Sequence, residues 1–192
     1  MRRMLVLVSV AVACAHRSET ASPDLRSFDQ AVYQTVLDSV VVPWASSGIR
    51  QLVIRNRTSV HRQVAGSFER FYRLPQVDSA AVRGLEARSR EPHPLTGLRS
   101  LKLRIPIVLV DDQTLNAFPK DLDQYWSQFY QRYPGSSGLI SLSSIGYNSK
   151  SDFAILMMYQ ECGVMCGNGY IAALRRVGET WGIVAIEGTP VS

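Results

Sequence analysis

The amino-acid sequence predicts an α+β fold in which N-terminal helices are followed by a C-terminal antiparallel β-meander. Apolar residues recur at helical spacing near the start of the chain, whereas its last third divides into short segments rich in strand-forming residues. Helices followed by consecutive strands are typical of α+β proteins, so we expect the helices to pack on one face of the sheet. A length of 192 residues, with 46% hydrophobic and 19% charged residues, suits one globular domain.

Four segments have the periodicity and the starting residues of helices. Ser22-Pro23-Asp24 can cap the first helix, and Asp112 can cap a short helix that runs through Phe118. The last helix carries an aromatic stripe, and such a stripe is more often part of a core than a platform for a ligand. The stripe consists of Leu122, Tyr125, Trp126, Phe129 and Tyr133. The helices are predicted at residues 22–39, 78–90, 112–118 and 121–132.

Six segments have the pattern of β-strands. Between residues 101 and 109, apolar residues alternate with Lys102 and Arg104, which predicts a half-buried strand. Pro106 places this strand at an edge or a bulge, because proline cannot donate a hydrogen bond to a neighbouring strand. Residues 153–158 are apolar on both faces, which predicts a central strand covered on each side. The strands are predicted at residues 49–58, 101–109, 139–144, 153–160, 170–176 and 181–186.

The first fourteen residues resemble the signal of a bacterial lipoprotein. Arg2 and Arg3 form a basic start, residues 4–12 form an apolar run too short to cross a bilayer, and Cys14 follows small residues. In lipoproteins, a cysteine at this place is acylated and becomes the first residue of the mature chain. The resemblance therefore implies export, lipidation of Cys14 and anchoring to a bacterial membrane.

On this interpretation, residues 1–13 are a signal peptide, residues 14–21 are a small polar tether, and residues 22–192 are a single α+β domain. Ala15, directly after the cysteine, is the kind of residue that permits sorting to an outer membrane, so we expect the anchor at the outer membrane or the periplasmic face. The alternative is an ordinary secretory signal that is cleaved near Ala13 or Ala15.

Acylation of Cys14 would leave Cys162 and Cys166 as the two thiols of the mature domain. An exported protein meets an oxidising compartment, so we expect a disulfide between them that makes a local loop rigid. A thiol–disulfide enzyme or redox sensor is the alternative. Such enzymes place Cys-x-x-Cys at a helix N-terminus, however, whereas these cysteines have three residues between them, flanking strands and no adjacent basic residue.

Basic residues concentrate between Arg50 and Arg104, where twelve lysines and arginines stand against four acidic residues. In an exported protein, this excess could meet anionic lipid head groups or acidic polysaccharide. We favour a solvated surface, because arginine is the prevailing basic residue throughout the chain. No basic strand with interleaved aromatic residues accompanies the excess, so the sequence does not predict nucleic acid as a partner.

Two motifs stand out within residues 125–192. The segments Phe129–Gly138 and Ser143–Asn148 form the first, and Cys162–Tyr170 forms the second. Together they resemble a group of uncharacterised bacterial exported proteins that pair an F-Y-x-R-Y-P-G-S-S-G-x-I segment with a C-G-x-L-C-G hairpin. Met165 stands where that group has leucine. The resemblance implies no activity.

The sequence predicts no catalytic, cofactor-binding or metal-binding residues. The spacing of a nucleophile elbow is absent around Ser136 and Ser137, which we expect to bond nearby backbone in a turn. None of the three histidines has a spacing that supports a triad, and oxidised Cys162 and Cys166 with Glu161 do not make a zinc site. Four further acids suit helix starts better than a hydrolytic pair. These acids are Asp111, Asp112, Asp121 and Asp123.

These observations predict a cell-envelope lipoprotein that acts as a non-catalytic binding or interaction module. It would contact the membrane through its lipid anchor and bind an envelope protein or ligand whose identity the sequence does not indicate. The alternative is a thiol–disulfide redox protein that uses Cys162 and Cys166. A third class, a hydrolase or isomerase, would require polar residues that converge inside a concave sheet.

Overall fold

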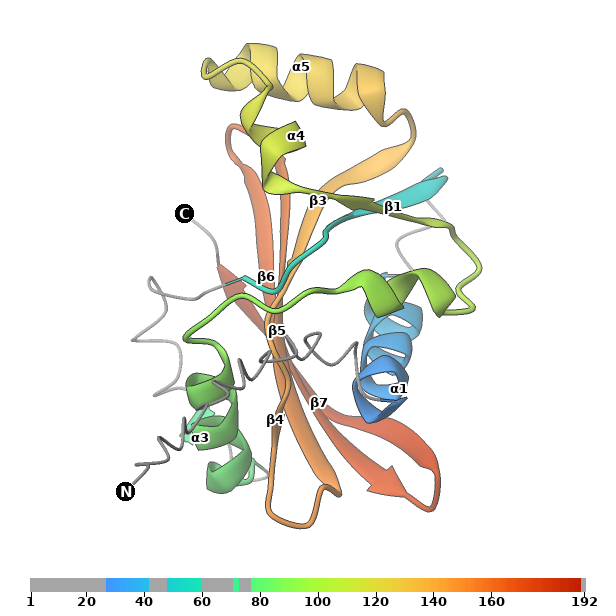
Figure 1. Ribbon diagram of the computed structural model, residues 1–192, viewed down its shortest axis with the longest axis vertical. Coiled ribbons are helices and arrows are strands. Elements are labelled where there is room, and N and C mark those ends of the chain that lie inside the picture. Colours follow the sequence, from blue (N-terminus) through green and yellow to red (C-terminus); the bar gives the residue numbers. More distant parts are fainter. Residues whose placement is uncertain (1–26, 42–47, 60–70, 73–76, 191–192) are drawn as a thin grey trace, which may run out of the picture.

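A seven-stranded mixed sheet forms the centre of the computed structural model, which describes residues 27–41, 48–59, 71–72 and 77–190 (Figure 1). The strands are β1 (Gln51–Arg55), β2 (Ile107–Val110), β3 (Ser136–Leu142), β4 (Gly146–Tyr147), β5 (Phe153–Gly163), β6 (Cys166–Val177) and β7 (Thr180–Pro190). Their order is β2-β1-β3-β5-β6-β7, and β4 also pairs with β5.

The C-terminal strands form the predicted antiparallel meander, because β5 pairs with β6 and β6 pairs with β7 in this sense. Strand β1, in contrast, pairs in parallel with both β2 and β3. The α+β prediction is therefore confirmed, but the meander describes only part of a mixed sheet. Parallel neighbours require long connections, and the pattern of each separate strand does not reveal which distant strand it will join.

The strand predicted at residues 101–109 is wrong in its first half. Residues Thr96–Ser100 form a 3₁₀ helix, and β2 begins only at Ile107. Ile105 is buried and Leu103 packs against the same apolar cluster, so the alternation reflects burial of a segment outside the sheet. Pro106 precedes β2, which is a terminal strand in the described order, and its carbonyl accepts a 2.9 Å hydrogen bond from the Leu52 N–H.

The α-helices lie within the predicted segments, and the π-helical turn that follows the first of them extends two residues beyond its predicted end. They are α1 (Ser27–Val36), which continues into a π-helical turn (Leu37–Val41), α3 (Ser79–Arg88), α4 (Asp112–Asn116) and α5 (Leu122–Arg132). Aspartates cap three of them by accepting backbone N–H groups, and Asp111 rather than the predicted Asp112 caps α4. Residues 1–26, with the predicted signal peptide, the tether and the start of the first helix, lie outside the described residues.

Residues 153–158 of strand β5 are buried on both faces, as their apolar run predicts. Ala154 and Leu156 belong to a cluster with α1, whereas Phe153 and Ile155 belong to a cluster with α3. Successive strand residues point to opposite faces, so α1 and α3 cover opposite sides of the sheet (Figure 1). The expectation that all helices share one face is therefore not confirmed.

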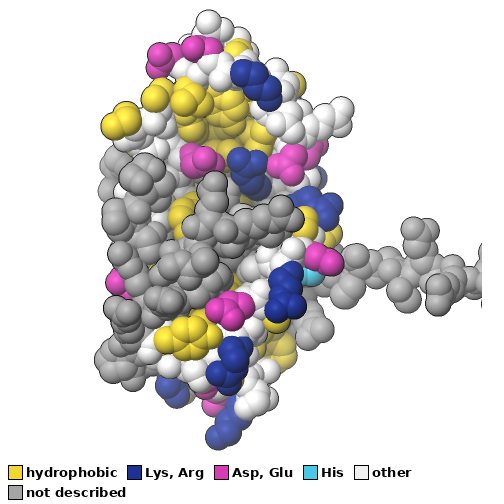
Figure 2. All heavy atoms as spheres, turned by 90° about the vertical axis from the view of Figure 1, so that its left-hand side faces the viewer, with side chains coloured by type: hydrophobic (Ala, Val, Ile, Leu, Met, Phe, Trp, Pro, Cys, Tyr) yellow, Lys and Arg dark blue, Asp and Glu magenta, His cyan; other side chains and the backbone are white. Residues whose placement is uncertain are grey.

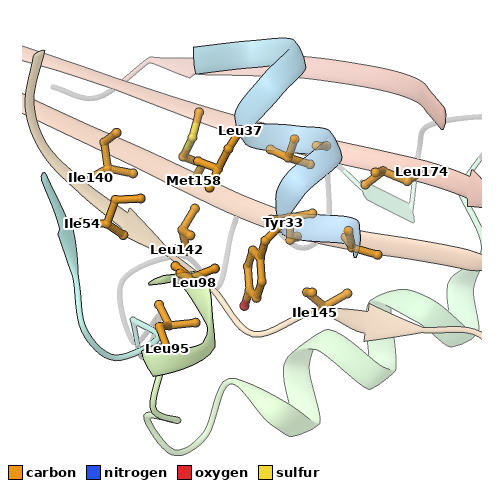
Figure 3. Close-up of a cluster of buried hydrophobic side chains, with 14 of the residues drawn as sticks. Tyr33, Leu37, Ile54, Leu95, Leu98, Ile140, Leu142, Ile145, Met158 and Leu174 are labelled. Carbon is orange, nitrogen blue, oxygen red and sulfur yellow. The ribbon is translucent and has the colours of Figure 1, made fainter. Parts of the chain in front are cut away.

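The cluster beneath α1 contains the buried hydroxyl of a tyrosine. Figure 3 shows Tyr33 of α1 and Leu37 of the π-helical turn beside Leu142 and Met158 of the sheet. The Tyr33 hydroxyl donates a 2.7 Å hydrogen bond to the carbonyl of Ser143. Burial raises the pKa of Tyr33, so this side chain remains a neutral donor.

A third apolar cluster attaches α5 to the end of the sheet that carries β1, β2 and β3. Phe129 is completely buried there with Val53 of β1 and Leu139 of β3. Leu115 and Phe118, at and after α4, complete the same cluster. This packing fixes the position of α5, which forms one wall of the site described below.

Candidate ligand-binding cleft

A cleft of about 470 Å³ lies between α5 and the hairpin that joins β5 to β6. This volume is in the range of sites that hold small ligands or a few side chains. Leu122, Tyr125 and Trp126 line it from α5, and Val164 and Met165 line it from the hairpin. Figure 2 shows apolar side chains gathered on the upper part of this face of the molecule, with both acidic and basic side chains around them.

The α5 wall divides the predicted aromatic stripe into two parts. Phe129 and Tyr133 are buried, as predicted, and Trp126 and Tyr125 are half-buried, with ring centroids 5.2 Å apart in an edge-to-face arrangement. Leu122, however, is 55% exposed, so its predicted place in the core is wrong. The buried contacts of α5 are at its C-terminal half, and the first turn therefore presents its apolar side chain to the cleft.

The hairpin wall is held by a disulfide. The sulfur atoms of Cys162 and Cys166 lie at disulfide distance, with their Cα atoms 5.0 Å apart, in agreement with the predicted bridge. Between the two cysteines, Val164 is 50% exposed and Met165 is 98% exposed. A covalent link across the base of the turn restricts its conformations, so these two side chains are held at the rim of the cleft.

Two further contacts fix the hairpin relative to α5 and β3. The Tyr130 hydroxyl donates a 2.8 Å hydrogen bond to the carbonyl of Cys162. Gly138 has a φ of +104°, and a Cβ atom at this position would overlap the carbonyl oxygen of Glu161. Glycine is therefore required for β3 to approach β5 beside the disulfide.

Arg55 brings a positive charge into the cleft from β1. Its Nη1 lies 3.0 Å from Oδ1 of Asp112, and its Nε donates a 3.1 Å hydrogen bond to Oγ of Ser141. Its Nη2 is 3.7 Å from Oε2 of Glu161, whose side chain is 51% exposed. Asp112 and Ser141 thus hold Arg55 more closely than Glu161 does, and Glu161 is the carboxylate that lines the cleft itself.

The tyrosines near the cleft are neutral hydrogen-bonding groups at ordinary pH. Partial burial raises the pKa of Tyr125, and the nearby charge of Glu161 raises it further, whereas the charge of Arg55 opposes the shift. Burial also raises the pKa of Tyr130, in keeping with its role as a donor to Cys162. The ionisable groups that carry charge in the cleft are therefore Arg55 and Glu161.

The fold changes one point of the redox interpretation. Both cysteines lie on strands rather than at the start of a helix, as the sequence predicts. The sequence shows no basic residue beside them, but Arg55 lines the same cleft as Cys166. Sequence reasoning missed Arg55 because β1 reaches β5 only through β3, and no local pattern indicates this order of strands.

The other polar residues considered as candidates do not converge on a site. Asp111 and Asp121 cap α4 and α5, and the hydrogen bond from the Thr114 N–H lowers the pKa of Asp111. His93 Nε2 lies 3.1 Å from the carbonyl of Arg88, and His61 is not among the described residues. In the described part of the chain, no group of three or more His, Cys, Asp or Glu side chains could hold a metal ion.

The serines of the predicted turn do not behave as expected. The hydroxyl oxygens of Ser136 and Ser137 are buried without a hydrogen-bond partner among residues 27–41, 48–59, 71–72 and 77–190. The predicted bonds from these hydroxyls to nearby backbone are therefore not formed within this part of the structure. Strand β3 begins directly at Ser136, so Ser136 and Ser137 belong to the sheet and not to a separate turn.

Several arginines of the basic segment make internal contacts. Arg88 Nη2 lies 3.1 Å from Oδ2 of Asp29, which is buried, and the Tyr147 hydroxyl donates a 2.9 Å hydrogen bond to Oδ1 of the same carboxylate. Burial raises the pKa of Tyr147, which keeps it a donor. Arg57 donates a 3.0 Å hydrogen bond to the carbonyl of Pro92. Part of the basic excess therefore stabilises the fold.

No family model matches the chain, and neither a curated protein nor a solved structure matches it. Within the described residues, no helix is long and apolar enough to span a membrane. Cys14, the predicted lipidation site, lies outside those residues.

Proposed function

We propose that this protein is an exported lipoprotein of a bacterial cell envelope that binds a partner non-catalytically in the cleft between α5 and the disulfide hairpin. One observation carries the binding role. Of the eight large hydrophobic side chains exposed in the described part of the chain, Leu122, Val164 and Met165 line this cleft. Exposed apolar side chains gathered in one place are typical of interaction surfaces, because water solvates them poorly.

The walls of the cleft are held in place without a ligand. Phe129 attaches α5 to the sheet, and the disulfide closes the hairpin. Walls that are already ordered reduce the conformational entropy lost on binding. Met165, at the tip of the hairpin, has a flexible side chain that can adapt to the surface of a partner.

The polar groups of the cleft support binding rather than catalysis. Arg55 and Glu161 contact each other, and the described residues that line the cleft include no serine, histidine or lysine. A nucleophile and a base within hydrogen-bond reach of each other are the usual requirement for hydrolytic chemistry. Among the described residues, both faces of β5 are covered by apolar clusters.

The anchor is supported by the resemblance of residues 1–14 to a lipoprotein signal. Cys14→Ser should release the protein from membranes or leave it unprocessed, because no thiol would remain to be acylated at this position. Cell fractionation together with incorporation of labelled palmitate tests this. A wild-type protein with an unmodified N-terminus, and a variant that partitions into membranes as the wild type does, would rule out the anchor.

Site-specific crosslinking in intact cells tests the binding site. A photo-crosslinking amino acid at Met165 should form discrete adducts, whereas the same amino acid at Val177, which is 75% exposed at the far end of β6, should not. Adducts that are equal at both positions, or absent at Met165, would contradict a binding role for the cleft. The Val177 position controls for exposure of an apolar side chain as such.

A thiol–disulfide function is the second candidate, and the proximity of Arg55 to the disulfide favours it. Cys166 is exposed and lies in the same cleft as Arg55, and a nearby cation stabilises a thiolate. The reduction potential separates the two functions. A structural disulfide should have a potential below about −300 mV, whereas that of a redox enzyme lies well above this value.

A further inference from the structure

The charges around the cleft restrict the chemistry of its ligand. Among the described residues, acidic side chains outnumber basic ones at the cleft and at the adjoining starts of α4 and α5. The acidic side chains are Glu161, Asp111, Asp112, Asp121 and Asp123, and the basic ones are Arg55, Lys120 and Arg132, whose charge acts on Asp111. A partner that approaches this apolar surface therefore meets a negative potential.

The single arginine of the cleft is already engaged. Arg55 has Asp112 at 3.0 Å and Ser141 at 3.1 Å, so an anionic ligand would compete with the carboxylate of Asp112 for it. Glu161 is more available, because it is half-exposed and lies 3.7 Å from Arg55. A cation placed beside Glu161 would gain an ion pair without breaking the contact between Arg55 and Asp112.

The apolar part of the cleft accepts a large side chain. Tyr125 and Trp126 present aromatic surface on one wall, and Val164 and Met165 present aliphatic surface on the other. A peptide segment supplies both requirements in adjacent residues, since one side chain can enter the apolar part while the next carries a charge. Membranes of bacterial envelopes are commonly anionic, and the acidic side chains around the cleft would repel their head groups.

From this geometry we infer that the cleft binds an exposed peptide segment in which a large apolar side chain stands next to a lysine or arginine. The apolar side chain lies between Trp126 and Met165, and the cation pairs with Glu161. This inference rests on the proposed function, because it names the ligand class of the same cleft.

Selection from a random peptide library displayed on phage, with the purified full-length protein immobilised in detergent, tests the inference. We expect enriched peptides to carry an aromatic or large aliphatic residue beside lysine or arginine. Glu161→Gln should weaken the binding of an enriched peptide by about three- to fivefold, the effect of losing one exposed ion pair. Selection on Glu161→Lys should instead enrich acidic residues beside the apolar one, a reversal that a merely structural role for Glu161 would not produce.

Matched variants separate failure of the inference from failure of the proposed function. Met165→Glu should weaken the binding of the same peptides at least tenfold, whereas Val177→Glu should leave their affinity unchanged. If the enriched peptides are apolar without a charge preference, and if Met165→Glu but not Glu161→Gln weakens their binding, the inferred cationic ligand would be wrong. The proposed role of the cleft in binding would then still hold. If the wild-type protein enriches no peptides beyond those enriched by Met165→Glu, both the inferred ligand and the proposed binding function would be wrong. If the protein binds only phosphatidylglycerol vesicles and Met165→Glu abolishes this binding, the ligand of the cleft is a membrane and not a peptide. Thermal denaturation of each variant checks that it is folded.

Discussion

The hydroxyl of Tyr130 donates a 2.8 Å hydrogen bond to the carbonyl of Cys162, and this bond joins α5 to the disulfide hairpin. The two walls of the candidate cleft are thus connected directly, in addition to their separate attachments to the sheet. The donor lies on the helix that carries Trp126, and the acceptor belongs to the cysteine that closes the turn carrying Met165. The separation of the walls therefore depends in part on a single side chain.

Tyr130→Phe should keep the ring packing and remove this bond. We expect the free energy of unfolding to fall by about 1 kcal/mol, the usual net value of one hydrogen bond. Amide hydrogen exchange should become faster in the hairpin around Cys162 than in β1, which controls for a global loss of stability. Unchanged exchange in the hairpin would show that the disulfide alone fixes it.

Phe129 and Trp126 should differ in their contributions to stability. Phe129 is completely buried, so Phe129→Ala should reduce the free energy of unfolding by about 3–5 kcal/mol through lost burial and a cavity. Trp126 is half-buried, and Trp126→Ala should cost about half as much. Urea denaturation of the two variants gives the comparison. Equal losses would mean that Trp126 is a core residue rather than a cleft residue.

Arg88→Ala should destabilise the protein, because Asp29 would remain buried without its cation. The expected loss is about 3 kcal/mol, at the low end for a broken buried pair, since the Arg88 side chain is partly exposed and Tyr147 still donates to the carboxylate. Combining Asp29→Asn with Arg88→Ala should restore part of the loss by removing the unpaired charge. The melting temperatures of the single and double variants measure this. If the losses of the two single variants simply add in the double variant, Asp29 and Arg88 are not coupled.

Asp78 should make the stability depend on acidic pH. The hydrogen bond from the Asn148 side chain, together with those from backbone N–H groups at the start of α3, lowers the pKa of Asp78 below its ordinary value of 3.8. The unfolded chain therefore binds this proton at a higher pH than the folded protein does. The stabilisation is complete above the unfolded pKa and is lost as the pH falls through the lowered folded value.

Asp78→Asn should reduce this acid sensitivity. Urea midpoints at pH 7 and pH 3 give the measurement, and the difference between them should be smaller in Asp78→Asn than in the wild type. Asp123→Asn is the matched control, because Asp123 also lies in the first turn of a helix but does not cap it. Identical pH differences in the wild type and in Asp78→Asn would contradict the contribution of this carboxylate.

Gly138→Ala should disturb the junction between β3 and the disulfide hairpin. The backbone there has a positive φ, and the added Cβ would overlap the Glu161 carbonyl, so we expect a loss of more than about 1 kcal/mol. Gly178 also has a positive φ but has open space around its Cβ position, and Gly178→Ala therefore measures the cost of the backbone conformation alone. Equal effects of the two substitutions would show that the close approach at Gly138 adds nothing.

The sequence by itself determined the elements that depend on local patterns. Helices α3, α4 and α5 lie within segments predicted from helix-starting residues and apolar periodicity, and the burial of residues 153–158 of β5 follows from their continuous apolar run. The bridge between Cys162 and Cys166 follows from an even number of thiols in a short turn. These features are set by residues close together in the chain.

Only the tertiary structure decided which distant segments became neighbours. The parallel pairing of β1 with β3 carries Arg55 toward Glu161, and the position of α5 leaves Leu122 exposed while Phe129 is buried. A stripe of apolar residues shows which face of a helix can be buried, but the extent of the surface beneath it decides how much of that face is covered. Phe129 is buried against the sheet whereas Leu122 remains exposed at the cleft, and no periodicity in the chain encodes this difference.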